Sequence, residues 1–102
     1  MKYYLISDNI DTIVGMRLAG VPGILAHDKK EVGDALKNAL DNKDIGIILI
    51  TQKLVKMFHD EIYELKLKNK SHLIVEIPDR HGGAGVSDAM LKYVREAVGI
   101  SI

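Results

Sequence analysis

The stretch Ile45-Gly46-Ile47-Ile48-Leu49-Ile50 is apolar at every position, and four of its six residues are isoleucine. Side chains of a strand point alternately to the two faces of a sheet, so an unbroken apolar run predicts a strand covered on both faces. Strands of this kind lie inside parallel sheets, where helices cover both sides. We therefore expect residues 45–50 to form the central strand of a parallel sheet.

Helices are predicted before and after this strand. Upstream, Asp28 and Glu31 have the spacing of a capping box, in which both side chains accept hydrogen bonds from unpaired amides at a helix start. Downstream, Thr51 is the expected N-cap of a single helix over residues 52–66. The apolar side chains expected to face inward are Val32, Ala35, Leu36, Ala39 and Leu40 in the upstream helix, and Val55, Phe58, Ile62 and Leu65 in the downstream one.

The N-terminal part predicts a strand at residues 3–6, because a short apolar run there ends at a polar turn. Asp11 is the expected N-cap of a helix over residues 12–19, and Gly20 is its natural stop. Apolar side chains surround much of this helix, and Arg17 is its one charged residue, which predicts burial on more than one side. Residues 23–27 can form only a short strand, of the kind found at sheet edges.

The C-terminal part predicts a strand at residues 73–77, an irregular loop at 78–85 and a helix over 86–98. The apolar face of that last helix covers about half of its circumference, wider than the roughly 100° needed to dock on a sheet. Two interpretations remain open. The face is either a broad core face, or its edge at Leu91 and Val98 lies against another protein, together with the apolar tail.

Four strands that alternate with helices predict an α/β fold with right-handed crossovers and helices on both faces of a parallel sheet. The expected strand order is 2-1-3-4, the flavodoxin-like or receiver-like winding of a Rossmann-like domain, shortened by one strand. At 102 residues the chain suits one domain. We expect residues 1–80 to form the α/β body, and residues 81–102 to form a loop, the C-terminal helix and a mobile tail.

Composition narrows the classes of function. Lys plus Arg and Asp plus Glu both number 14, so the formal net charge is zero, whereas a nucleic-acid-binding domain usually carries a basic excess. No apolar run approaches the roughly 20 residues of a membrane-spanning helix, so direct membrane insertion is not expected. The chain has no cysteine, which excludes disulfides and thiolate metal sites.

Ligands of such folds usually bind at the carboxyl ends of the strands. The positions to consider are Ser7-Asp8-Asn9, His27-Asp28, Thr51-Gln52 and residues 78–85. A phospho-receiver domain needs an acceptor aspartate directly after its third strand. The sequence there is Ile50-Thr51, which argues against that activity because the reaction would have no nucleophile.

Other site signatures are also incomplete. The glycine-rich residues 82–85 have the wrong spacing for a dinucleotide or Walker motif, although backbone amides before a helix can hold an anion. The histidines, His27, His59, His72 and His81, share no metal-ligand spacing. The sequence therefore predicts no catalytic residue, no metal site and no cofactor.

Two segments carry a family resemblance. Residues 7–21 read SDNIDTIVGMRLAGV, an acidic turn followed by a Gly-x-Arg-Leu-Ala-Gly helix end, and residues 44–51 read DIGIILIT. Both resemble the F subunit of the bacterial and archaeal V/A-type rotary ATPases, and the first segment is the more specific. Residues 74–78 and 97–100 also fit, so the resemblance spans nearly the whole chain.

The resemblance implies a role rather than a reaction. The F subunit is a small non-catalytic part of the central rotor, docked on the coiled-coil D subunit within the catalytic A/B headpiece. That stalk couples ATP synthesis or hydrolysis to H⁺ or Na⁺ transport, so the chain would be cytoplasmic and peripheral to the membrane through the complex. The resemblance also implies regulation of ATPase activity through a mobile C-terminal segment, here residues 86–102 with a hinge at 82–85.

Partner contacts are expected on the last helix, because interface energy concentrates in a few buried apolar or aromatic side chains. The expected contacts are Met90, Leu91, Val94, Val98 and Ile100, with Arg95 as a charge at the rim. A different class of function remains open: a flavodoxin-like domain that binds a small molecule or nucleotide at Asp8, Thr51 and the glycine loop.

Overall fold

The computed structural model describes residues 2–68 and 72–78. In chain order these residues form β1 (Lys2–Ser7), α1 (Ile10–Leu18), β2 (Gly23–Leu25), α2 (Lys29–Asp41), β3 (Ile45–Thr51), α3 (Gln52–Met57), α4 (His59–Lys68) and β4 (Leu73–Ile77). The loop, last helix and tail expected from the sequence lie outside the described residues. The division at residue 80 is therefore still a prediction.

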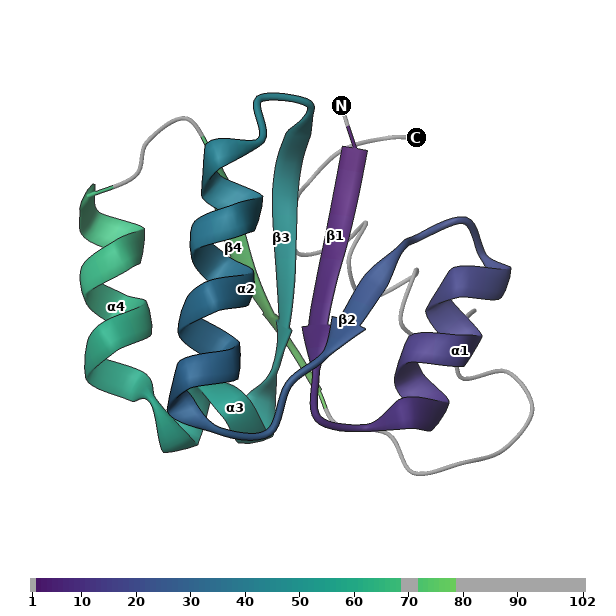
Figure 1. Ribbon diagram of the computed structural model, residues 1–102, viewed down its shortest axis with the longest axis horizontal. Helices are drawn as coiled ribbons and strands as arrows, with labels where there is room; N and C mark the ends of the chain where they lie inside the picture. The colour runs from purple at the N-terminus through teal and green to yellow at the C-terminus, as the bar shows by residue number, and fades with distance from the viewer. Residues whose placement is uncertain (1, 69–71, 79–102) are drawn as a thin grey trace.

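The four strands form one parallel sheet in the order β2-β1-β3-β4 (Figure 1). Leu5 of β1 is paired with Leu49 of β3, which in turn is paired with Val75 of β4. The apolar strand β3 thus lies between two neighbours, as its composition predicts. The short strand β2 lies at one edge, and the predicted order 2-1-3-4 is confirmed.

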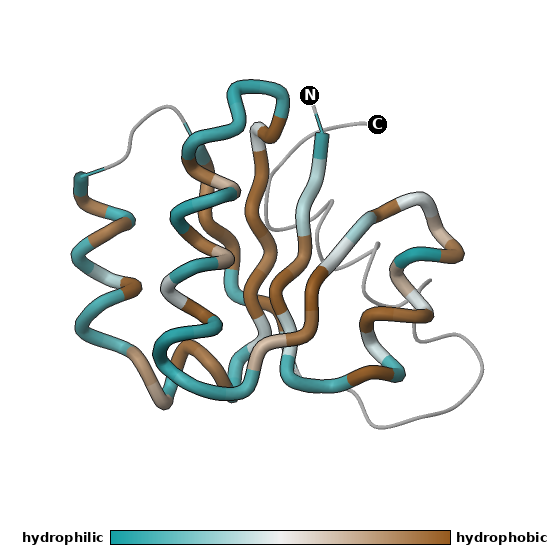
Figure 2. The backbone as a smooth tube through the Cα atoms, in the orientation of Figure 1, coloured by the Kyte–Doolittle hydropathy of each residue, from teal (hydrophilic) through white to brown (hydrophobic). Residues whose placement is uncertain are grey.

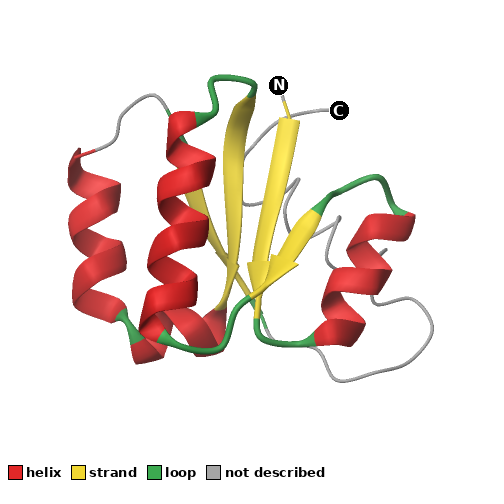
Figure 3. Cartoon of the chain, in the orientation of Figure 1, coloured by secondary structure: helices red, strands yellow, loops and turns green. Residues whose placement is uncertain are grey.

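Alternate residues of the central strands enter two separate cores. Ile6, Ile48 and Ile50 pack with side chains of α2, α3 and α4 on one face of the sheet. Leu5 and Leu49 pack with Ile13 and Met16 of α1 on the other face. The inward residues predicted for the helices after β2 and β3 all belong to the first core or pack against it. Figure 3 shows α2 and α4 together on one side and α1 apart from them.

The ends of α1 are fixed by local hydrogen bonds. Asn9 is the N-cap, and its Oδ1 accepts hydrogen bonds from the backbone N–H groups of Asp11, at 2.8 Å, and Thr12, at 3.4 Å. The prediction that Asp11 caps this helix is therefore wrong. Asp11 instead lies in the first turn, where its charge faces the positive end of the helix dipole.

The predicted stop at Gly20 is confirmed. Gly20 has a φ of 90°, a conformation that costs glycine little. Its N–H donates to the carbonyl of Arg17 at 2.9 Å, and the N–H of Val21 donates to the carbonyl of Met16 at 2.9 Å. This pair of bonds is a Schellman motif, and the buried contact between Val21 and Met16 completes it.

Residues 52–66 do not form the single helix that was expected. The backbone at Phe58 has φ −126° and ψ 38°, outside the helical region, and separates α3 from α4. Asp60 and Glu61 then fall in the first turn of α4, where acidic side chains favour a new helix start. Phe58 still packs against the first core, so the break changes the path of the chain without exposing the expected apolar face.

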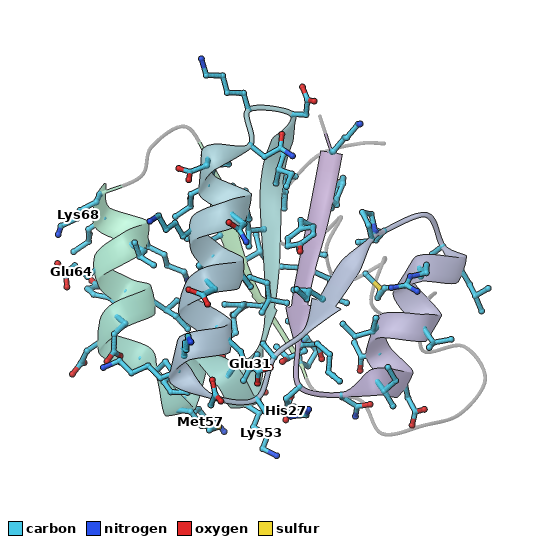
Figure 4. All side chains as sticks on the ribbon, viewed as in Figure 1. His27, Glu31, Lys53, Met57, Glu64 and Lys68 are labelled. Atoms are coloured by element: carbon cyan, nitrogen blue, oxygen red, sulfur yellow. The ribbon has the colours of Figure 1, made fainter. Side chains whose placement is uncertain are left out.

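Charged side chains form ion pairs on the outer side of α4, beside the exposed Tyr63 and Leu67. Lys68 forms an ion pair with Glu64 one turn earlier (Figure 4), and Lys29 of α2 reaches Glu61 at 3.0 Å. The hydrogen bond from Lys29 lowers the pKa of Glu61 below its ordinary value. Because these groups are well exposed, such pairs contribute little to stability.

The outer side of α1 exposes apolar side chains and forms no ion pair among the described residues. Thr12, Ile13 and Met16 are buried, whereas Val14 and Leu18 are 49% and 84% exposed. Figure 2 shows apolar residues recurring along α1, while α2 and α4 carry long hydrophilic stretches. Within the part of the chain that the structure describes, α1 is buried on one side only, so the prediction of burial on more than one side is wrong there.

Candidate functional site

The carboxyl ends of β1 and β3 meet where the winding of the sheet changes direction, the usual ligand position in this class of fold. Asp8 follows β1 there, and its side chain is only 12% exposed. One of its carboxylate oxygens lies 3.4 Å from Thr51 Oγ1, which donates a hydrogen bond, and the other lies 3.2 Å from Lys53 Nζ. The structure therefore brings together Asp8 and Thr51, two residues predicted to be near each other, and adds Lys53.

Thr51 does not cap α3 through its side chain, although it occupies the N-cap position. Its hydroxyl is directed to Asp8 instead, so the predicted N-cap position is confirmed, whereas the side-chain hydrogen bond of a cap is not formed. On the neighbouring turn, Ser7 Oγ accepts a hydrogen bond from the backbone N–H of Asn9 at 3.0 Å. The polar side chains at this crevice thus contact other parts of the same chain. That arrangement fixes the loop after β1 against the start of α3.

His27 and Asp28 form hydrogen bonds at the start of α2. Asp28 Oδ1 accepts a hydrogen bond from the N–H of Glu31 at 2.8 Å, as predicted, while Glu31 Oε1 accepts from the N–H of His27 at 3.1 Å. The second bond of the capping box therefore goes to the residue before the N-cap. In the view of Figure 4, His27, Glu31 and Lys53 lie along the same edge of the molecule.

The described histidines each lie in a separate setting. The His59 ring stacks on Tyr63 with ring centres 5.8 Å apart, and His72 Nε2 lies 3.2 Å from the carbonyl of Asn42. Within residues 2–68 and 72–78, no group of three or more His, Asp or Glu side chains is placed to hold a metal ion. His81 and the glycine loop lie outside that part of the chain.

A separate depression of about 580 Å³ lies at the opposite edge, near the amino ends of the strands. Its lining includes Tyr3, Tyr4, Pro22 and Asn42. Burial raises the pKa of the Tyr4 hydroxyl above its ordinary value. This depression is not at the position where the fold class usually binds ligands.

The predicted partner contacts Met90, Leu91, Val94, Arg95, Val98 and Ile100 all lie outside the described residues. One apolar surface that the structure does show is on α1, formed by Ile10, Val14 and Leu18 at successive helical turns. We call this surface the outer stripe. Sequence reasoning identified these apolar positions in part but assigned them to the core, since periodicity does not distinguish a core face from an exposed one.

The fold and the contacts of Asp8 define the class of protein. It is a small doubly wound α/β domain in which side chains of the chain itself, those of Asp8, Thr51 and Lys53, contact one another at the carboxyl ends of the strands. No helix in the described part of the chain is long and apolar enough to cross a membrane. The chain belongs to the ATP synthase (F/14-kDa) subunit family, whose family model matches residues 4–94.

Several relatives match along the entire chain. It is 33% identical over 103 residues to the F subunit of the A-type ATP synthase of Methanocaldococcus jannaschii, covering 100% of this chain and 99% of the relative. It is 35% identical over 107 residues to the protein of the same name from Thermococcus kodakarensis, with 100% and 98% covered. The corresponding Methanococcus aeolicus protein is 37% identical over 106 residues, with 100% and 99% covered. The family resemblance proposed from the sequence is confirmed.

Proposed function

We propose that this protein is a non-catalytic subunit of the central stalk of an A-type or V-type rotary ATPase. The observation that carries the proposal is the match over the whole chain to proteins named as the F subunit of an A-type ATP synthase. In this role the protein docks on the coiled-coil D subunit of the stalk, inside the catalytic A/B headpiece. It turns with the stalk, which couples ATP synthesis or hydrolysis to H⁺ or Na⁺ transport at the membrane.

The proposed location follows from the proposed role. The protein is cytoplasmic and is held at the membrane periphery by the rest of the complex. Met90, Leu91, Val94, Val98 and Ile100 contact the stalk, and Arg95 lies at the rim of that contact. The C-terminal segment that carries them modulates ATPase activity by changing its position.

The arrangement at the crevice supports a non-catalytic role. Both oxygens of Asp8 are in contact with side chains of the same chain, so a ligand there would have to displace Thr51 and Lys53. The alternative function, a small molecule or nucleotide bound at Asp8, Thr51 and the glycine loop, would require that rearrangement. Isothermal titration with ATP or flavin mononucleotide tests the alternative, and saturable binding that Asp8→Asn abolishes would favour it.

Co-purification tests the proposed function directly. The tagged full chain is used to isolate complexes from membranes of the source cells, and mass spectrometry identifies the co-eluting proteins. Recovery of a long helical stalk protein with the ATPase headpiece is the expected result. A monomer that carries a bound cofactor and no partner would refute it. The double variant Leu91→Asp/Val98→Asp should elute without the stalk while its thermal unfolding stays close to that of the wild type.

A further inference from the structure

The outer stripe of α1 is apolar on the side of the helix that faces away from the sheet. Ile10, Val14 and Leu18 are 56%, 49% and 84% exposed. Their four-residue spacing places them one above the other, opposite the buried side chains of Ile13 and Met16. In Figure 1, α1 stands at the β2 end of the sheet, and among the described residues no element lies beyond it. Within residues 2–68 and 72–78, no other element covers these three side chains.

We propose that the outer stripe is a docking surface for an α-helix of a neighbouring subunit in the rotary complex. This inference rests on the proposed function, and it adds a contact surface separate from the C-terminal residues named above. The partner helix carries an apolar stripe of its own and lies along α1.

The shape of the stripe favours a helix as its occupant. Side chains four residues apart form a continuous ridge on a helix surface, and such ridges pack into the grooves between the side-chain rows of another helix. From Ile10 to Leu18 the ridge is about 12 Å long, at roughly 1.5 Å per residue. Two turns of a partner helix cover that length, whereas a narrow pocket would accept only one of the three side chains.

The size of the stripe argues against a second copy of this chain. A helix of nine residues is about 14 Å long and, with side chains, roughly 10 Å wide, so one face offers on the order of 140 Å². A stable pair of proteins usually buries about 800 Å² on each partner. The stripe alone is too small for a homodimer. A surface of this size suits one contact among several, as in an assembly where other surfaces contribute most of the buried area.

Charges at the ends of the stripe indicate the chemistry of the partner helix. Asp11 is exposed beside the first turn of the stripe, and Arg17 is exposed beside its last turn. We therefore expect a basic side chain of the partner opposite Asp11 and an acidic one opposite Arg17. Such rim charges mainly set orientation and association rate.

The test compares exposed apolar residues on different sides of the sheet. Val14→Lys/Leu18→Lys removes the apolar ridge, and lysine keeps high helix propensity. Leu67→Lys on α4 is the matched control, because Leu67 is 64% exposed and lies on the helix layer opposite α1. Each variant is titrated against the ATPase complex reconstituted without this protein, and its thermal unfolding is recorded beforehand.

We expect the Val14→Lys/Leu18→Lys variant to bind about thirtyfold or more weakly than wild type, as for the loss of one interface hot spot. The Leu67→Lys control should bind within about threefold of wild type. Wild-type binding that the double variant retains would overturn this inference and leave the proposed function standing. No binding by wild type would refute both. A wild-type dimer that the double variant abolishes would identify a second copy as the occupant and overturn the inference.

A cross-linking measurement covers the case in which the double variant fails to fold. The chain has no cysteine, so Leu18→Cys and Leu67→Cys each introduce one thiol at an exposed position. A photo-reactive label at residue 18 should cross-link to a helical segment of another protein in the assembled complex, while the label at residue 67 should not. If residue 18 labels no other component of a complex that contains the chain, the inference is overturned.

Discussion

The glycines at positions 23 and 33 should respond in opposite ways to the same one-carbon change. Gly23 begins β2 and is paired with Leu5 of β1. A methyl group added there would lie 3.0 Å from Leu5 Cβ and 3.0 Å from the Leu5 carbonyl oxygen. The second contact is with backbone held in the middle of the sheet, so it cannot move aside cheaply. At Gly33, on the exposed side of α2, an added methyl group meets nothing within 4 Å.

The expected magnitudes follow from these contacts. Gly23→Ala overpacks the edge of the sheet and should lower the free energy of unfolding by about 1–3 kcal/mol. For a domain of this size that corresponds to a decrease in Tm of roughly 4–24 °C. Gly33→Ala should raise the free energy of unfolding by about 0.5–1 kcal/mol, because alanine loses less backbone entropy in a helix than glycine.

Urea unfolding followed by circular dichroism measures both variants against wild type. The slope of the free energy against urea concentration should stay constant, so that a shift in midpoint reports stability alone. The reasoning would be refuted if Gly23→Ala were neutral or stabilising, since β2 could then move away from β1 without cost. A loss of stability in Gly33→Ala would refute the assignment of that position to an open helix surface.

Four further variants test the cap, the core and the pH dependence. Asn9→Ala should cost about 1 kcal/mol of stability through loss of the N-cap of α1, and Asp11→Ala should cost less, as urea midpoints would show. Leu36→Ala should cost about 2–5 kcal/mol, because this leucine of α2 is 2% exposed; equal stability of the variant would contradict its place in the core. The raised pKa of Tyr4 means that the unfolded state ionises first. Stability should therefore be fully present below pH 10.0 and decrease as the pH rises through the folded pKa. Tyr4→Phe should flatten that decrease.

The sheet could be predicted from the sequence because its signals are local and strong. The unbroken apolar run of β3 has one physical explanation, a strand buried on both faces. Gly20 ends α1 because only a residue that tolerates positive φ fits the Schellman motif. These constraints, repeated along the chain, leave few ways to arrange four parallel strands.

The failures occurred where neighbouring residues compete for one role. Asp8, Asn9 and Asp11 all have side chains able to cap α1, and only the path of the loop after β1 selects Asn9. Asp8 does not cap the helix because its carboxylate contacts Thr51 and Lys53. Both residues are far away in sequence. The contact with Asp8 also explains why Thr51 does not use its hydroxyl as a cap.

The break at Phe58 and the outer stripe of α1 were not predictable for a different reason. No glycine or proline marks residue 58, so the periodic apolar pattern continues across a change in backbone direction. On α1 the pattern indicates that a side is apolar but not what covers it. The strand ends predicted that Asp8 and Thr51 lie near each other, whereas the contact of Lys53 with Asp8 depends on the turn into α3 and was not predicted.

The pairing of β1 with β3 sets an order of events while the chain is being made. Leu5 cannot pair with Leu49, its neighbour in the sheet, until Leu49 has been synthesised. At about 5–20 residues per second, the roughly 44 positions between them take about 2–9 s to synthesise. Throughout that interval β1 can pair with only one neighbouring strand, the three-residue β2. Newly made β1 is therefore a natural target for chaperones, and slow codons placed before residue 45 should lengthen the period in which the chain is open to aggregation.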